Sequence, residues 1–121
     1  LVADDVEMNR EIVQSFLSDA NHEVTCVEDG AEAVAAAAAA DYDVILMDVR
    51  MPRVDGLEAT RRIRRLVGPR GQVPIVGVTA QAFAEQVADC RKAGMDAHLS
   101  KPFSPDALLA AVAHAAEVRP A

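Results

Sequence analysis

Three aspartates stand where short apolar segments end. Asp4 and Asp5 follow the apolar residues 1–3, and Asp48 directly follows the apolar residues 44–47. In an open parallel sheet, functional side chains gather at the carboxyl ends of the strands, near the point where strand order reverses. If the two strands are neighbours, we expect the three carboxylates to converge in one shallow pocket.

A cluster of like charges is unfavourable unless something neutralises it. Two carboxylates about 4 Å apart repel each other by about 1 kcal/mol in water and by about 4 kcal/mol at an effective dielectric constant near 20. A divalent cation neutralises them most simply, and hard oxygen ligands with room for water suit Mg²⁺. An isolated aspartate at the start of a loop is more often a helix cap or a solvated charge. The pairing of Asp48 with a second acidic strand end favours a metal site instead.

The same residues could accept a phosphoryl group. The carboxylate of Asp48 can attack phosphorus and form an acyl phosphate. A metal bound to Asp5 would screen the repulsion between the two anions, and Asp4 would hold the water shell of the metal. Thr79 and Lys101 each follow a predicted strand, and each alone is more often a cap or a solvated charge. Together with the acids, they supply the donors that a phosphoryl group needs.

The elements that must position these side chains alternate along the chain. Short apolar runs, typical of buried parallel strands, are separated by segments with helical spacing, which predicts about five β-α units. We expect strands over 1–3, 23–27, 44–47, 73–78 and 97–100. We expect helices around 12–20, over 31–40 and 57–66, from about 83 to Gly94, and from Pro105 after the cap Ser104. The helix residues expected to face the core are Ile12, Val13, Phe16, Leu17, Ala20, Leu57, Ile63, Leu66, Phe83, Val87, Cys90, Leu108, Leu109 and Val112.

Composition limits the classes of function. A chain of 121 residues with 51% hydrophobic residues predicts one domain with a real core. The net charge of −7 argues against direct nucleic-acid binding, and the basic cluster 61–65 is interpreted as a solvated helix face.

Cys26 and Cys90 lack metal-ligand spacing. Two cysteines alone also make no disulfide framework, so we expect a reducing, cytoplasmic setting. No apolar run approaches the ~20 residues that cross a bilayer, so we expect no membrane contact. Because the chain begins partway through an apolar strand, we expect it to be part of a longer protein.

These motifs together resemble the receiver domains of bacterial two-component response regulators, the CheY-like superfamily. The matching stretches occur in the order of that family and span nearly the whole chain. They are Ala3-Asp4-Asp5, Val44 to Asp48 continuing through Val49-Arg50-Met51-Pro52 to Asp55-Gly56, Val78-Thr79-Ala80, and Lys101-Pro102-Phe103. The resemblance implies an α/β, flavodoxin-like fold: a doubly wound, five-stranded parallel sheet of order 2-1-3-4-5 with helices on both faces. Residues 4–10 and 94–103 are also similar to receivers fused to hybrid sensor histidine kinases.

The resemblance also implies roles for individual residues. Asp48 would be phosphorylated, Mg²⁺ would bind Asp5, Asp48 and the backbone carbonyl of Arg50, and Asp4 would act through water. Thr79 and Lys101 would bind the phosphoryl oxygens. The bond between Lys101 and Pro102 is expected to be cis, and Arg50 and Gln81 occupy positions that tune dephosphorylation in similar proteins.

The function implied is that of a signalling domain rather than an enzyme. It would take a phosphoryl group from the phosphohistidine of a histidine kinase or histidine phosphotransfer domain, lose it slowly by itself, and switch its interactions. The switch is expected at Thr79, at residues 80–83 and at His98, where the family commonly has Phe or Tyr. For His98, a partly buried ring at a strand edge and a signalling side chain that titrates near pH ~6.5 are equal alternatives. The cognate kinase and the oligomeric state stay open.

Two other functions fit parts of the pattern. A haloacid-dehalogenase-like phosphatase also uses a strand-end aspartate, Mg²⁺, a threonine and a lysine, but such enzymes resemble Asp-x-Asp at the nucleophile, whereas Arg50 stands two places after Asp48. A scaffold that works without phosphorylation would have the same fold. It is disfavoured because all five active-site positions are filled.

Overall fold

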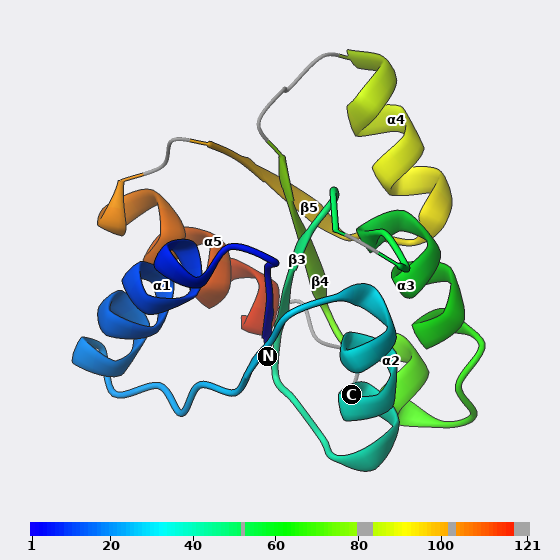
Figure 1. Cartoon of the computed structure of the whole chain (residues 1–121), viewed down its shortest axis with the longest axis horizontal. Coiled ribbons are helices and arrows are strands. Elements are labelled where there is room, and N and C mark those ends of the chain that lie inside the picture. Colours follow the sequence, from blue (N-terminus) through cyan, green and yellow to red (C-terminus); the bar gives the residue numbers. More distant parts are fainter. Residues whose placement is uncertain (52, 80–83, 102–103, 118–121) are drawn as a thin grey trace.

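The structure, a computed structural model, describes residues 1–51, 53–79, 84–101 and 104–117. A five-stranded parallel sheet of order β2-β1-β3-β4-β5 forms its centre, which confirms the expected α/β fold (Figure 1). The strands are β1 (Val2–Ala3), β2 (Cys26–Val27), β3 (Ile45–Asp48), β4 (Ile75–Thr79) and β5 (Ala97–Ser100). The helices are α1 (Glu7–Asp19), α2 (Gly30–Ala39), α3 (Gly56–Arg64), α4 (Ala84–Ala93) and α5 (Pro105–Glu117), with a short 3₁₀ helix η1 (Pro69–Gln72) before β4. None of the described helices is long and apolar enough to cross a bilayer.

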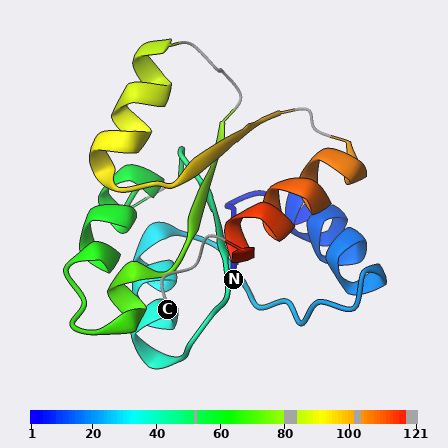
Figure 2. The ribbon, with the colours of Figure 1, turned by 180° about the vertical axis from the view of Figure 1, so that it is seen from behind.

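Helices cover both faces of the sheet. Helices α1 and α5 lie on one face, and α2, α3 and α4 lie on the other, as the views from the two sides show (Figures 1 and 2). Because successive strand side chains point to opposite faces, Ile45 and Met47 of β3 pack under α2 and α3, whereas Leu46 packs under α1 and α5. Two aliphatic cores therefore hold the strands between them and fix where each strand ends.

Aspartate followed by glycine begins two of the helices. The side chain of Asp29 accepts a hydrogen bond from the backbone N–H of Glu32 at the start of α2, and Asp55 does the same for α3. The glycines are needed because the backbone of another segment approaches closely. A Cβ atom on Gly30 would lie 2.1 Å from the carbonyl oxygen of Val54, and one on Gly56 would lie 2.1 Å from that of Asp48. Ser104 caps α5 as expected, with its hydroxyl accepting from the N–H of Ala107 at 3.1 Å.

Some boundaries and faces differ from the sequence expectations. The strand expected over 23–27 is limited to β2, because β1 offers only Val2 and Ala3 as ladder partners. Ile12 was expected to face the core but is 44% exposed. The buried positions of α1 are Val13 and Leu17, and a residue adjacent to Val13 lies about 100° away around the helix, past the edge of the buried stripe. Phe83 lies outside the described residues.

The basic cluster of α3 is not one uniform solvated face. Arg61 and Arg62 are half-exposed and pair with Glu58 one turn earlier, as expected. Arg64 instead turns inward, and its side chain is only 23% exposed. Its guanidinium binds backbone carbonyls and Asp96 near the starts of β4 and β5. The prediction that this arginine is solvated was therefore wrong.

Candidate functional site

The carboxyl ends of β1 and β3 lie side by side, so the predicted acidic residues meet there. The ladder pairs Ala3 with Met47, which places Asp4 next to Asp48. In the sheet, β2 lies on one side of β1 and β3 lies on the other. The strand order therefore reverses at β1, and the carboxyl ends of β1 and β3 form the switch point of the sheet. The sequence placed the aspartates correctly because each follows the last apolar residue of a strand.

The three aspartates form a compact cluster of carboxylates. One carboxylate oxygen from each of Asp4, Asp5 and Asp48 lies within 4.8 Å of the other two. Asp4 is 6% exposed and Asp48 is 7% exposed, whereas Asp5 is open to solvent. A set of hard oxygen ligands with one open side matches what Mg²⁺ prefers, since that ion keeps several of its waters. The cluster could therefore hold a divalent metal ion.

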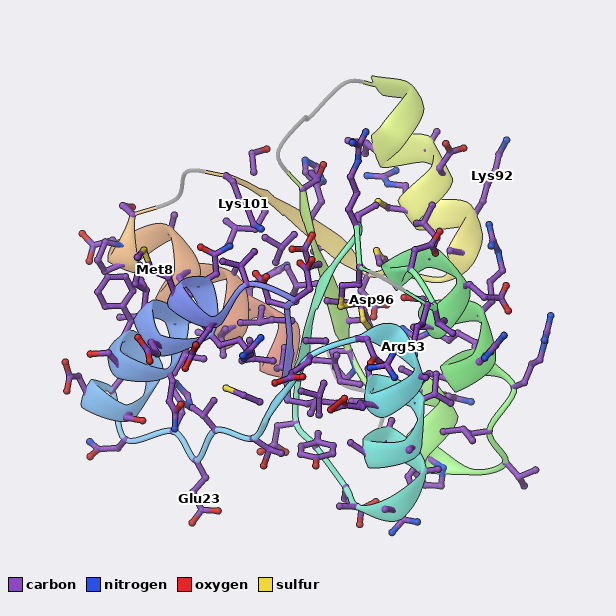
Figure 3. All side chains as sticks on the ribbon, in the orientation of Figure 1. Met8, Glu23, Arg53, Lys92, Asp96 and Lys101 are labelled. Carbon is purple, nitrogen blue, oxygen red and sulfur yellow. The ribbon has the colours of Figure 1, made fainter. Side chains whose placement is uncertain are left out.

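Lys101 connects the two buried carboxylates. It lies just after β5 (Figure 3), and its ammonium donates to Asp48 Oδ2 at 2.9 Å and to Asp4 Oδ2 at 3.4 Å. The other oxygens accept from backbone N–H groups: Asp4 Oδ1 from Val6 at 2.9 Å and Asp48 Oδ1 from Arg50 at 3.2 Å. Both inner carboxylates are thus fixed in direction, which is what a positioned ligand or nucleophile requires.

Burial and neighbouring charges shift the pKa of Asp48. Burial raises the pKa of Asp48 above its ordinary value of 3.8, and the charge of Asp4 adds to the rise. The hydrogen bond and charge of Lys101 lower that pKa but do not cancel the effect of burial. An acid with a raised pKa favours the fold in its neutral form, so this contribution is present at low pH and is lost as the pH rises through the raised pKa. Ionised Asp48 therefore costs stability at neutral pH, and a bound cation would offset that cost.

Lys101 remains charged in this site. Burial alone would lower its pKa, but contacts with Asp48 and Asp4 outweigh burial and raise the pKa above 10.5. The favourable contribution of this group is therefore present below pH 10.5 and is lost only as the pH rises through the raised pKa. At neutral pH, the ammonium group already occupies the space between the two acids as a cation.

The other predicted site residues differ in how deeply they are buried. Thr79 is buried at the end of β4, and its carbonyl oxygen accepts from the backbone N–H of Lys101 at 2.8 Å. His98 is exposed on the edge strand β5, so the alternative of a partly buried ring is not what the structure shows. Arg50 follows β3 with an exposed side chain. Residues 80–83, Pro52, and the Lys101–Pro102 bond with Phe103 lie outside the described residues.

One residue near the site was not anticipated. Arg10, in the second turn of α1, donates from Nη1 to the carbonyl oxygen of Asp4 at 2.8 Å and lies 3.6 Å from a carboxylate oxygen of Glu28. It therefore joins the residues that follow β1 and β2. The only sequence signal was a single basic residue in an otherwise acidic helix start, which is too weak to predict a backbone contact.

Comparison with known proteins places the chain in a family. Residues 1–113 match the family described as the response regulator receiver domain. The sensor histidine kinase RcsC of Salmonella typhi is 39% identical over 117 residues, and the sensor protein GacS of Pseudomonas syringae pv. syringae is 42% identical over 106 residues. The matches cover 97% and 86% of this chain, respectively, but only 12% of each relative. The chain thus spans about an eighth of the length of these curated relatives.

Solved structures agree with this result. The receiver domain of the sensor histidine kinase PA1611 from Pseudomonas aeruginosa PAO1, solved with a magnesium ion coordinated in its active-site cleft, superimposes with a TM-score of 0.89 at 35% identity. That match covers 96% of this chain and 94% of the other. The chemotaxis response regulator CheY4 of Vibrio cholerae gives a TM-score of 0.87 at 33% identity, with 94% of both chains covered. The chain belongs to the response regulator receiver domain family.

Proposed function

We propose that this domain accepts a phosphoryl group on Asp48 from a phosphohistidine and that it needs Mg²⁺ to do so. The observation that carries the proposal is the cluster of Asp4, Asp5 and Asp48 beside the Lys101 ammonium, at the switch point of the sheet. Family membership supports it, because the receiver domain of PA1611, which holds magnesium in its active-site cleft, has the same fold. The reaction forms a bond between Asp48 and phosphorus and breaks the P–N bond of phosphohistidine, whose imidazole leaves with the electron pair.

Each residue of the site would have a separate role in the reaction. Asp5, Asp48 and the Arg50 carbonyl would hold the metal, with Asp4 acting through water. The bound ion would screen the repulsion between the attacking carboxylate and the phosphoryl oxygens. Thr79 and Lys101 would donate to those oxygens as charge moves onto them. Lys101 would exchange its present contact with Asp48 for one with the phosphoryl group, a shift that lies within reach of a flexible side chain.

The expected partner is a histidine kinase or a histidine phosphotransfer domain. The relatives RcsC and GacS are sensor proteins far longer than this chain, which fits a receiver that works inside or beside a kinase. We propose a signalling domain that slowly loses its own phosphoryl group rather than a phosphatase with continuous turnover. Thr79 and the exposed His98 would report the phosphorylated state to partners. Steady hydrolysis of p-nitrophenyl phosphate would argue against this assignment.

Asp48→Asn is expected to abolish phosphorylation. Incubated with Mg²⁺ and acetyl phosphate, the wild-type domain should gain the mass of one phosphoryl group, because the small acyl phosphate can donate to Asp48 without a partner. The adduct should be released by hydroxylamine, which cleaves acyl phosphates. Intact-mass spectrometry of the wild type, Asp48→Asn and the exposed-site control Asp41→Asn measures this directly. A mass gain that persists in Asp48→Asn would defeat the proposal.

Magnesium binding is expected to weaken as the pH falls toward the raised pKa of Asp48. A proton and a metal ion compete for the same carboxylate, so below that pKa the dissociation constant should rise by about tenfold per pH unit. Burial places the midpoint of this loss above 3.8, the ordinary pKa of the group. Calorimetric titrations with Mg²⁺ across a pH series would locate it. A midpoint at or below 3.8 would contradict the assigned electrostatics.

A further inference from the structure

The loop between β3 and α3 is attached to the N-terminal end of α2 by an ion pair. Arg53 lies beside the start of α2 (Figure 3). Its guanidinium contacts Asp29 and lies 4.0 Å from a carboxylate oxygen of Glu32. The side chain of Arg53 is 70% exposed, whereas that of Asp29 is only 1% exposed. An exposed arginine therefore reaches down to a buried acid, and that acid is also the N-cap of α2. Removing the partner of a buried charge costs more than breaking an ion pair on an open surface.

A second contact joins the same two segments independently of any side chain. The backbone N–H of Gly30 donates to the carbonyl oxygen of Val54 at 3.0 Å. The approach is so close that a Cβ atom on Gly30 would lie 2.1 Å from that oxygen. Two consecutive loop residues, Arg53 and Val54, thus contact two consecutive residues at the start of α2.

The backbone of Arg53 is held in an unusual conformation at this contact. Its φ angle is +65°, in the left-handed region that favours glycine and is costly for a residue with a Cβ. Glycine would be less strained than arginine in this backbone conformation. The contact between the arginine side chain and Asp29 offsets part of the cost of that strain. This favours a specific role for the ion pair over a chance surface contact.

The attached loop carries the backbone of Arg50, whose carbonyl is a proposed metal ligand. At the β3 end, the N–H of Arg50 donates to Asp48 Oδ1 at 3.2 Å, and the carbonyl of Val49 accepts from Gly56 at 2.9 Å. Next to α3, the loop is held by that Gly56 bond and by the Asp55 cap, and among the described residues its contacts with α2 come from Arg53 and Val54. The position of the Arg50 peptide therefore depends on both ends.

We propose that Arg53 and Asp29 are positioning residues for the metal site: their ion pair holds the loop so that the Arg50 carbonyl points at the acidic cluster. Magnesium affinity is then set partly by α2, which contributes no ligand. This inference rests on the proposed function, because it assumes that the carboxylate cluster binds Mg²⁺. Supports of metal ligands commonly change metal affinity by tenfold or more when they are removed.

Arg53→Gly is expected to weaken Mg²⁺ binding about tenfold, and Arg53→Lys to restore most of the affinity. Glycine suits the positive φ angle, so Arg53→Gly removes the ion pair without adding backbone strain. Asp29→Asn keeps an N-cap oxygen for α2 and removes the charge, and should weaken binding similarly. The double variant combines Arg53→Gly with Asp29→Asn. Its Mg²⁺ affinity should be no lower than that of the weaker-binding single variant, because both changes break the same contact. The dissociation constant is measured by calorimetric titration with Mg²⁺ alone.

The matched control is Arg70, which holds the other end of α2. Its guanidinium binds Asp41 at 2.9 Å and the carbonyl oxygen of Ala38 at 2.8 Å, far from the acidic cluster. Arg70→Ala should leave Mg²⁺ affinity within twofold of the wild type. Equal weakening in Arg70→Ala, unchanged affinity in Arg53→Gly, or additive losses in the double variant would each overturn the positioning role.

The failure of this inference can be told apart from failure of the proposed function. If the wild-type domain binds no Mg²⁺, the metal site itself is wrong and the positioning role falls with it. If the wild type binds Mg²⁺ and accepts phosphate on Asp48 while Arg53→Gly binds equally well, only the positioning role is wrong. Thermal unfolding of each variant without metal provides the second readout, since a purely structural role would lower the midpoint and leave the dissociation constant unchanged.

Discussion

Lys101→Met is expected to strengthen Mg²⁺ binding about tenfold while slowing phosphorylation of Asp48 by acetyl phosphate about 100-fold. The first effect follows from competition between cations. The ammonium contacts Asp48 at 2.9 Å and Asp4 at 3.4 Å, so it already neutralises the acids that a metal ion would bind. Removing it leaves two buried carboxylates without a counter-charge, and a divalent ion then gains more by binding.

The second effect follows from the loss of a donor at the reacting centre. A positioned cation stabilises charge that develops on the phosphoryl oxygens, and one such donor commonly contributes a factor of about 100 to the rate. Methionine preserves the length and apolar stem of the side chain but offers no charge. Binding and reaction should therefore change in opposite directions, which a general loss of folding cannot produce.

Lys92→Met provides the control for Lys101→Met. The chain has only these two lysines, and Lys92 is exposed near the end of α4, pointing away from the molecule (Figure 3). Lys92→Met should leave both the Mg²⁺ affinity and the rate of phosphorylation unchanged. Calorimetry gives the Mg²⁺ dissociation constant, and intact-mass time courses give the rate. Weaker Mg²⁺ binding in Lys101→Met would show that the lysine supports the metal site instead of competing with it.

Arg64→Ala is expected to lower the free energy of unfolding by about 3 kcal/mol, and the midpoint of thermal unfolding by about 10 °C. The guanidinium donates to the carbonyl oxygens of Gly71, Val73 and Gly94 at 3.0, 2.7 and 2.9 Å, and to Asp96 at 2.9 Å. Alanine would leave these acceptors without their donor, and hydrogen bonds to a charged group are among the stronger ones. The variant should lose the connection between α3, the start of β4 and the turn before β5.

Two further variants test the geometry of this contact. Arg64→Lys should recover less than half of the loss, because an ammonium cannot reproduce the planar fork of five donors. Arg62→Ala removes an arginine whose guanidinium pairs with Glu58 on the helix surface, and should cost less than about 0.5 kcal/mol. Chemical denaturation measures all three. Equal losses for Arg64→Ala and Arg62→Ala would contradict the role assigned to Arg64.

The acidic cluster could be predicted from sequence because its geometry depends on strand ends. Asp4 and Asp48 each follow an apolar run, and in a parallel sheet such positions meet at one edge whatever the details of packing. Lys101 follows the same rule at the end of β5, two strands beyond β3 in the sheet. Features that short-range sequence patterns specify could therefore be predicted, including the alternation of strands and helices and the cap at Ser104.

Long side chains were the main source of error. Arg64 is one of four arginines between residues 61 and 65, and nothing in that pattern indicates which one turns inward, because its acceptors come from segments 7 to 32 residues away. The pairing of Arg53 with Asp29, 24 residues apart, was missed for the same reason. Ile12 was misplaced because it lies about 100° around α1 from the buried Val13, past the edge of the buried stripe. Such contacts depend on how the helices dock, which periodicity alone does not determine.

The alanines of α2 have a consequence for the distance between layers. Ala33 is fully buried and Ala37 is 2% exposed, and these small side chains let the helix axis lie close to the sheet. Larger residues at these two positions would push the helix outward, and its first turn, with Asp29 and Gly30, would move away from Val54. The alanine-rich segment carries no reactive group. Its small side chains nevertheless set the distance between helix and sheet that keeps the start of α2 in contact with the loop after Asp48, the proposed phosphoacceptor.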